Sequence, residues 1–232
     1  MKYDCLIVDD EEALSQSTCK YFNMFDIKTR WVSDAESCLE FFAENQADLI
    51  LLDINLGESS GFDLCRHLRE TINVPILFIS ARTSDDDVLL ALNIGGDDYI
   101  QKPYSLAVVL AKVKAVLKRY RNPLTGSQES GEFVSGRLRI DLQNESVFVK
   151  EREIELTAME YRLLVYLVKN RGRTAIKDEI FENVWGDSIT GDNTLNVHIR
   201  HLREKIEADA NKPRFIKTVW GVGYEFYGGH TE

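Results

Sequence analysis

The sequence predicts an α/β domain built on an open, doubly wound, five-stranded parallel sheet, followed by a smaller α+β domain. In the first half, short apolar runs alternate with stretches of helical spacing. A segment rich in Pro, Gly and Ser interrupts the chain near its middle. Alternating patterns, helices and a hairpin pattern then follow. The length of 232 residues suits two modest domains, since a domain commonly has about 150 residues.

The first half supplies five strand-then-helix units. We expect strands at 5–8, 30–32, 48–54, 75–80 and 98–100, and helices at 13–24, 35–45, 62–70, 86–94 and 105–119. Residues 49–52 read LILL and are apolar on both faces, as a central parallel strand requires. Ligands of such sheets bind at the carboxyl ends of the strands.

The middle segment 121–132 reads RNPLTGSQESGE. It predicts a linker at 122–131 between domains 1–121 and 132–232.

The second half predicts strands, helices and a terminal hairpin. Alternation indicates short antiparallel strands at 137–141, 146–149 and 153–156. Thr157, with Glu160 three residues later, predicts a capping box on a helix that ends at Lys169. Further helices are expected at 177–184 and 192–208, and a hairpin at 215–219 and 224–227. Helices followed by a β hairpin form a winged helix-turn-helix.

The composition excludes several classes of protein. Hydrophobic residues at 44% and charged residues at 28% are ordinary globular values. No apolar run approaches the length of a membrane span, and the first residues do not resemble a signal peptide. The four cysteines have no metal-ligand spacing, so we expect reduced, buried thiols in a cytoplasmic protein without a membrane partner.

Charge is distributed unevenly along the chain. Residues 1–131 carry 13 basic and 21 acidic side chains, and residues 132–232 carry 15 and 17, which gives −8 and −2 of the total −10. Within 193–220, six basic residues stand against three acidic ones. This local excess of +3 favours a nucleic-acid partner for the second domain.

Polar side chains follow the strands of the predicted sheet at its carboxyl edge. Asp9 and Asp10 follow the first strand and Asp53 ends the third. Close carboxylates repel one another, and a hard divalent cation such as Mg²⁺ removes the repulsion. Ser80 ends the next strand and Lys102 follows the fifth. A metal, an attackable carboxylate, a hydroxyl and an ammonium fit phosphoryl transfer to an aspartate.

Each of these signals has an ordinary alternative when it is taken alone. Paired aspartates after a strand often form a solvated turn, a single Asp is often a helix cap, and a Lys before Pro is usually only exposed. Their coincidence at the strand ends of one sheet favours a site.

The helix at 192–208 carries a candidate DNA-reading face. An apolar stripe (Leu195, Ile199, Leu202 and Ile206) is expected to pack inside. Outside this stripe, the helix is expected to offer base contacts from Asn193, Asn196, Arg200 and His201, phosphate contacts from Thr194 and Arg203, and a further contact from Val197. The hairpin that follows is expected to add a phosphate contact from Lys217 and a further contact from Trp220.

Motifs in both halves resemble one known family. Those of the first half are Val8-Asp9-Asp10-Glu11-Glu12, Leu52-Asp53-Ile54, Ser80-Ala81 and Lys102-Pro103. They resemble the receiver domain of two-component response regulators. The second half has Leu156-Thr157-x-x-Glu160, Val184-Trp185-Gly186, Val197-His198-Ile199-Arg200-x-Leu202-Arg203 and Gly221-Val222-Gly223-Tyr224. It resembles the OmpR/PhoB-type effector domain.

The resemblance implies a transcription factor that is controlled by phosphorylation rather than a conventional enzyme. Asp53 would accept a phosphoryl group from a sensor histidine kinase and release it slowly. Mg²⁺ would be bound by Asp10, Asp53 and the backbone carbonyl of Asn55, with Asp9 acting through water. Ser80 and Tyr99 would move on activation, and the Lys102-Pro103 peptide bond would be cis.

The resemblance also implies partners: promoter DNA in direct repeats, RNA polymerase and a second copy of the chain. In this family, activated receivers pair through ion pairs between subunits. Asp97, Asp98 and Lys112 suit one such pair. Leu90 and Val108 stand where a second pair is common, so with Leu89 they predict a partly apolar dimer contact.

The chain departs from the family pattern at the wing. Trp220 stands where a basic residue is common, and it could stack on DNA sugars or pack against its own domain. Asn193 also replaces a frequent basic residue. Trp185 could pack near the DNA backbone or in the core.

Two other functions fit these residues less well. A haloacid-dehalogenase-like phosphatase would need a second Asp two residues after Asp53, where Asn55 stands. A DNA binder that is independent of phosphorylation would have no need of the carboxylate, hydroxyl and lysine set.

Overall fold

The computed structural model describes residues 1–57, 59–82, 84–121, 131–186 and 191–228. The chain forms two compact units, Met1–Arg121 and Asn122–Glu232, and each is considered by itself. Most of the expected linker, 122–131, lies outside the described residues.

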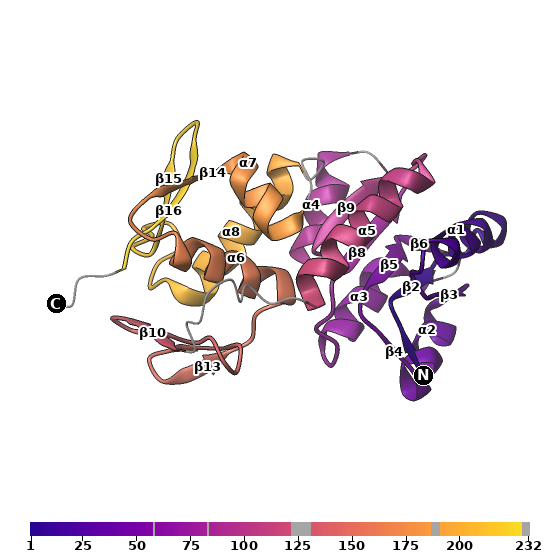
Figure 1. The fold of residues 1–232 in the computed structure, drawn as a ribbon, viewed down its shortest axis with the longest axis horizontal. Helices are drawn as coiled ribbons and strands as arrows, with labels where there is room; N and C mark the ends of the chain where they lie inside the picture. The colour runs from indigo at the N-terminus through magenta and orange to yellow at the C-terminus, as the bar shows by residue number, and fades with distance from the viewer. Residues whose placement is uncertain (58, 83, 122–130, 187–190, 229–232) are drawn as a thin grey trace. The chain divides into compact units, whose positions relative to one another are not determined.

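The first unit contains the predicted five-stranded parallel sheet (Figure 1), whose strand order is β3-β2-β5-β8-β9. The strands are β2 Cys5–Val8, β3 Thr29–Val32, β5 Ile50–Asp53, β8 Ile76–Ser80 and β9 Asp98–Gln101. The helices are α1 Glu12–Met24, α2 Ala35–Glu44, α3 Gly61–Arg69, α4 Asp85–Asn93 and α5 Leu106–Arg121. Two short strand pairs were not predicted: β1 Lys2–Tyr3 with β4 Gln46–Ala47, and β6 Asn55–Leu56 with β7 Ser59–Ser60.

Helices cover both faces of this sheet. One apolar cluster joins Ile50 and Leu52 of the sheet region to side chains of α2, α3 and α4. The other joins Leu49 and Leu51 to side chains of α1 and α5. The central strand is therefore buried on both faces, as its sequence predicts. This packing leaves the carboxyl ends of the strands as the place for polar side chains.

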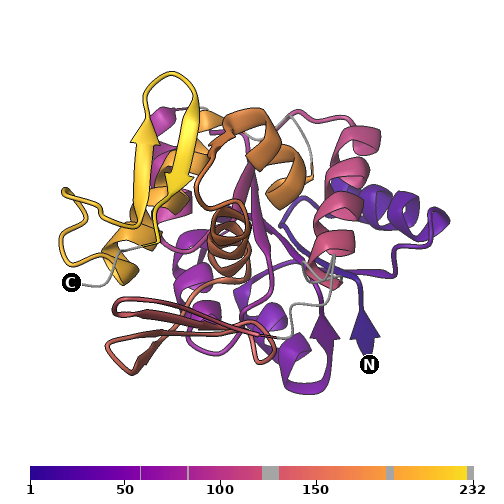
Figure 2. The same cartoon turned by 60° about the vertical axis from the view of Figure 1, so that its left-hand side comes forward.

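The second unit contains two antiparallel sheets and a group of helices. The first sheet comprises β10 Glu132–Ser135, β11 Leu138–Asp141, β12 Ser146–Val149 and β13 Arg152–Ile154, in that order. The helical segments are α6 Ala158–Lys169, α7 Lys177–Ile180, the π-helical turn η1 Phe181–Trp185 and α8 Asp192–Ile206. The second sheet, in the order β14-β16-β15, comprises β14 Thr174–Ile176, β16 Gly223–Phe226 and β15 Ile216–Val219. Figure 2 shows the β15–β16 hairpin in yellow, with its turn projecting from the unit.

Local signals in this unit are confirmed. The Thr157 hydroxyl accepts from the Glu160 backbone N–H, and the Glu160 carboxylate accepts from the Thr157 N–H, which completes the capping box. The predicted stripe of α8 is buried, from Leu195 to Ile206. Trp185 has no exposed surface and lies in the same apolar core, so its role is packing.

The four cysteines are free thiols, as expected. Burial raises the pKa of the Cys38 and Cys65 thiols to about 12, so both stay protonated near neutral pH. Among the described residues, no helix is long and apolar enough to cross a membrane.

Candidate functional site

Strand register brings the predicted pocket residues to one edge of the first sheet. Val8 pairs with Leu52 in parallel strands, so the residues that follow them, Asp9 and Asp53, end side by side. On the other side of β5, Asp53 pairs with Ile79, the residue before Ser80.

The last strand completes this edge. Ser80 of β8 pairs with Gln101 of β9, and Lys102 is the next residue. The peptide bond between Lys102 and Pro103 is cis, as predicted.

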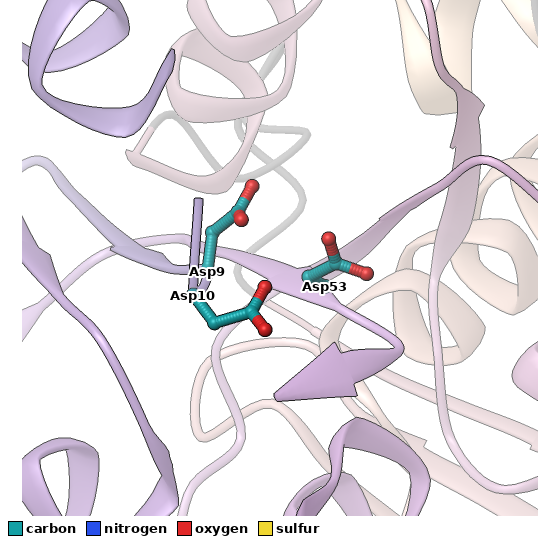
Figure 3. Close-up of side chains that lie close together, drawn as sticks. All are labelled: Asp9, Asp10 and Asp53. Atoms are coloured by element: carbon teal, nitrogen blue, oxygen red, sulfur yellow. The ribbon is translucent and has the colours of Figure 1, made fainter. Parts of the chain in front are cut away.

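Three carboxylates converge there (Figure 3). Asp9, Asp10 and Asp53 each offer an oxygen, and these atoms all lie within 4.8 Å of one another. Asp9 and Asp53 are buried, and each accepts a hydrogen bond from the backbone N–H two residues further on, at 2.8 and 2.9 Å. Asp10 is exposed and accepts from the Gly57 N–H at 3.1 Å. These bonds hold one oxygen of each carboxylate in place.

The Lys102 ammonium lies inside this acidic group. Its Nζ atom is 2.6 Å from an oxygen of Asp53, 2.9 Å from Asp9 and 2.7 Å from Glu11. Burial lowers the pKa of Lys102, but hydrogen bonds to the three carboxylates outweigh it and leave that pKa above its ordinary value. Burial raises the pKa of Asp53, and the hydrogen bond from Lys102 opposes that rise. The lysine therefore remains a cation beside Asp53.

The donor set fits a hard divalent cation. Three carboxylates, those of Asp9, Glu11 and Asp53, contact the Lys102 ammonium, and the Asp10 carboxylate lies beside those of Asp9 and Asp53. The excess negative charge is partly buried, and every candidate ligand atom is oxygen, which Mg²⁺ prefers.

Ser80 and Tyr99 are connected through the backbone of Arg82. Ser80 is fully buried, and its Oγ accepts from the Arg82 N–H at 3.2 Å. The Tyr99 hydroxyl donates to the Arg82 carbonyl at 2.7 Å. The Arg82 side chain reaches Asn55 Oδ1 at 3.1 Å and Asp87 Oδ1 at 3.3 Å. The sequence interpretation missed Arg82, because no pattern indicated that its side chain would reach the pocket's edge.

The outer face of α8 presents several of the proposed DNA contacts. Asn193, Asn196 and Arg200 are exposed. The Arg200 guanidinium pairs with Glu204 at 2.8 Å, and both side chains face solvent. Such an exposed pair is weak and can be exchanged for a DNA contact.

Three of the proposed DNA contacts are buried or bonded within the chain. Thr194 and Val197 are buried, with 3% and 5% of their surface exposed, so a DNA contact from either side chain stays a prediction. Arg203 donates to the Ile216 carbonyl through Nε and Nη2, and to Thr218 Oγ1 at 2.9 Å. It therefore fastens α8 to β15, and its proposed phosphate contact stays a prediction.

The remaining proposed contacts differ in exposure. His201 is half-buried, and its Nδ1 lies 3.5 Å from Glu160 Oε1. Lys217 is exposed, with Nζ 4.2 Å from the centre of the Tyr227 ring. Trp220 has 88% of its surface exposed, which excludes packing against its own domain.

Comparison with known proteins agrees with this architecture. The profile described as "Response regulator receiver domain" matches residues 5–114, and "Transcriptional regulatory protein, C terminal" matches residues 151–226. The sensory transduction protein RegX3 of Mycolicibacterium smegmatis is 37% identical over 96% of this chain and 98% of its own. The alkaline phosphatase synthesis transcriptional regulatory protein PhoP of Bacillus subtilis is 36% identical over 97% of both. The chain belongs to the OmpR/PhoB-type response regulators.

Solved structures support the same fold class for this response regulator. DrrB of Thermotoga maritima, described as an OmpR/PhoB homolog, is 29% identical, with a TM-score of 0.52 over 98% of this chain and all of that chain. A mutant of RitR is 27% identical, with a TM-score of 0.73 over the same shares. The first unit is thus a receiver domain and the second a winged-helix DNA-binding domain, in a family of transcription regulators rather than conventional enzymes.

The charged residues of the expected dimer contact form ion pairs within the regulator itself. Asp98 pairs with Lys112 at 2.6 Å and Asp97 with Arg69 at 2.6 Å, all within one receiver. Asp97, Asp98 and Lys112 have 1%, 2% and 3% of their surface exposed. These ion pairs lie inside the receiver, and their part in a dimer contact stays a prediction.

The apolar part of the expected dimer surface is exposed. Leu90 of α4 and Val108 of α5 have 42% and 44% of their surface exposed, and Leu89 is half-buried. Leu90 and Val108 are therefore available for contact with another molecule.

Proposed function

We propose that phosphorylation of Asp53 switches this regulator on. A histidine kinase supplies the phosphoryl group with Mg²⁺, the receivers then pair, and α8 with the wing at 214–227 binds promoter DNA. The observation that carries the proposal is the Lys102 ammonium, 2.6 Å from Asp53 and 2.9 Å from Asp9. Transfer of an anionic phosphoryl group to the Asp53 carboxylate requires a cation beside that carboxylate to neutralise the negative charge, and Lys102 is such a cation.

The chemistry follows from the residues of the pocket. An Asp53 carboxylate oxygen forms a bond to phosphorus as the bond from phosphorus to the donor histidine breaks. Lys102 neutralises one phosphoryl oxygen and the Ser80 hydroxyl donates to another. Asp10, Asp53 and the Asn55 carbonyl, with Asp9 acting through water, would hold Mg²⁺, which would supply further positive charge. Slow hydrolysis of the acyl phosphate resets the receiver.

The switch is proposed to start at Ser80. When its hydroxyl turns to the phosphoryl group, the bond from the Arg82 N–H is lost, and the Tyr99 hydroxyl, which bonds to the Arg82 carbonyl, moves with that backbone. This changes the start of α4, where Arg82 pairs with Asp87. The α4 surface then becomes competent to pair with a second receiver.

The DNA partner is proposed to be a promoter with direct repeats, read in the cytoplasm and in contact with RNA polymerase. Asn193, Asn196 and Arg200 of α8 remain candidates for base edges, and Lys217 for phosphate. His201 would need to leave Glu160 to take part.

We expect phosphodonor treatment to strengthen DNA binding. The regulator should bind a duplex, selected by it from a random-sequence pool, at least about tenfold more tightly after acetyl phosphate and Mg²⁺ treatment, because pairing links two binding events. Fluorescence anisotropy of the labelled duplex measures this change. Equal affinity with and without the phosphodonor would favour a DNA binder that is independent of phosphorylation.

The dimer contact is expected to resist salt. Leu90 and Val108 bury apolar surface rather than charge, so added NaCl should change the dimer dissociation constant little. Leu90→Arg should weaken the dimer by at least about tenfold, because it buries a charge. Adding Val108→Glu should partly restore it. Sedimentation of the phosphodonor-treated protein measures all three forms.

A matched control is available on the same domain. Leu39 of α2 is also exposed, at 39%, so Leu39→Arg makes the same change away from α4. It should leave dimerisation unchanged. A Leu90→Arg protein that dimerises like the Leu39→Arg control would refute the apolar contact.

A further inference from the structure

We propose that Trp31 is a positioning residue for the acidic pocket: its indole N–H holds the backbone between Asp9 and Asp10 in the orientation that Mg²⁺ binding requires. The inference rests on the proposed function and deepens it, because it names a residue outside the pocket that prepares the pocket for the ion. Trp31 itself would contact neither the ion nor the phosphoryl group.

The observation that carries the inference is a hydrogen bond at the edge of the receiver sheet. Trp31 lies on β3, an edge strand, and its Nε1–H donates to the backbone carbonyl of Asp9 at 2.8 Å. The Asp9 N–H in turn donates to the carbonyl of Val32, the next residue of β3, at 3.2 Å. Strand β3 therefore bonds to both backbone groups of Asp9, at the point where the chain leaves β2.

The bonded carbonyl connects two of the proposed metal ligands. The Asp9 carbonyl belongs to the planar peptide unit that also contains the Asp10 nitrogen. Rotation of this unit would turn the Asp9 and Asp10 side chains relative to one another. It would thereby separate carboxylate oxygens that now lie within 4.8 Å of each other and of Asp53. The bond from Trp31 opposes this rotation.

The free pocket needs such a restraint because its carboxylates repel one another. The Lys102 ammonium offsets the repulsion at Asp9 and Asp53, which it contacts at 2.9 and 2.6 Å. Asp10 is the exposed member of the trio, so its position depends strongly on the backbone that carries it. A backbone that is already fixed reduces the ordering that Mg²⁺ binding must impose.

Packing outside the pocket holds the indole in place. Trp31 is half-buried and lies against the apolar cluster that joins the sheet to α1 and α5. Cys19 and Tyr21 of α1 pack against the same cluster. The ring is thus supported by apolar neighbours, and its N–H is left to bond the Asp9 carbonyl.

Trp31→Phe should weaken Mg²⁺ binding more than it slows phosphorylation. The substitution keeps an aromatic ring and removes the N–H. Loss of an outer group that orients metal ligands commonly costs about tenfold or more in metal affinity, and calorimetric titration of the full-length regulator with MgCl₂ measures this loss. Labelling by acetyl phosphate should need more Mg²⁺ but should reach the wild-type rate at saturation, because Asp53, Lys102 and Ser80 are unchanged.

Tyr21→Phe is the matched control. It removes a hydroxyl from another aromatic ring against the same cluster and leaves the bond between Trp31 and Asp9 intact. The Tyr21→Phe protein should bind Mg²⁺ as tightly as wild type. Far-ultraviolet circular dichroism checks that both variants are folded.

The emission of Trp31 reports the same bond in a protein that keeps it. In a Trp220→Phe background, the remaining tryptophans are Trp31 and Trp185, and Trp185 is fully buried in the second unit. Because the Trp31 N–H is bonded to the peptide unit between Asp9 and Asp10, its emission should change along the calorimetric Mg²⁺ binding curve. Adding Trp31→Phe should remove that change.

The outcomes separate this inference from the proposed function. Mg²⁺ affinity that is equal in Trp31→Phe and wild type would overturn the inference and leave the proposed function standing. An equal loss of affinity in Tyr21→Phe would also overturn it, because packing rather than the N–H would then be the cause. If Trp31→Phe does not fold, the emission experiment decides, and Trp31 emission that is unchanged at saturating Mg²⁺ overturns the inference. A wild-type protein that binds no Mg²⁺ would refute the proposed function as well.

Discussion

Asp53→Asn should abolish labelling of the regulator by acetyl phosphate in the presence of Mg²⁺. The amide cannot form the acyl phosphate, and no other described carboxylate lies as close to Lys102 Nζ as Asp53, at 2.6 Å. The fold should survive, because Lys102 keeps Asp9 and Glu11 as partners. Intact-protein mass spectrometry should show one added phosphoryl group on the wild type and none on the variant.

Lys102→Ala tests the electrostatic part of the same pocket. Loss of one preorganised donor to a charged transition state costs roughly 100-fold or more in rate, so labelling should be slowed but should still occur at Asp53. Asp63→Asn is the control, since Asp63 lies on α3 with its side chain 73% exposed. Labelling of Asp53→Asn at the wild-type rate would show that another group is the acceptor.

Much of the pocket could be predicted because parallel strands end at one edge of their sheet. The apolar runs predict the strands, so the polar residue that follows each run is expected at that shared edge of the sheet. The position of Lys102 followed from the same rule. The position of the Arg82 side chain could not be predicted, because that side chain bonds to Asn55, which is 27 residues away in the sequence.

Charged residues on amphipathic helices were harder to place. Lys112 shares its face of α5 with Val109, Val113 and Val116, all buried, so its spacing already indicated the interior. Its partner Asp98 lies on a different element, which the sequence does not identify. Arg203 likewise bonds to a strand 13 residues away. Long side chains reach partners that local patterns do not contain.

Two strands of the second unit, β10 and β14, were also not predicted, for another reason. β14 has three residues, and β10 follows directly after the linker segment. Each lies at the edge of its sheet and pairs with a single neighbour. Such strands are stabilised by that neighbour rather than by their own hydrophobic pattern.

Glu160→Ala should destabilise the DNA-binding domain by about 3 kcal/mol, at the lower end of the cost of breaking a buried ion pair. Glu160 is 2% exposed, and its Oε2 accepts from Lys205 Nζ at 2.6 Å and from the Thr157 N–H at 2.8 Å. The lower end applies because the Lys205 side chain is 35% exposed and can regain water. Urea unfolding, followed by tryptophan emission in a Trp31→Phe background, reports this domain alone.

The pH dependence of the same carboxylate gives an independent measurement. Burial alone would raise the pKa of Glu160, but the hydrogen bond from His201, the charge of Lys205 and the capping bond outweigh it and lower the pKa to about 2. A carboxyl with a lowered folded-state pKa stabilises the fold fully above its unfolded value, near 4.5. That stability is lost as the pH falls from there toward 2. The acid loss should total roughly 3 kcal/mol, by the usual conversion from pKa.

Glu160→Gln should therefore be less stable than wild type at neutral pH, and the difference should shrink below pH 4.5, because the amide does not titrate. Glu155→Gln, at an exposed position three residues before α6 begins, should follow the wild-type curve. A Glu160→Gln protein that loses stability in acid as steeply as wild type would show that other groups cause the loss. Because the Glu160 carboxylate also contacts His201 and Lys205 of α8, its protonation should loosen the helix that is proposed to read DNA, and DNA affinity should fall in the same pH range.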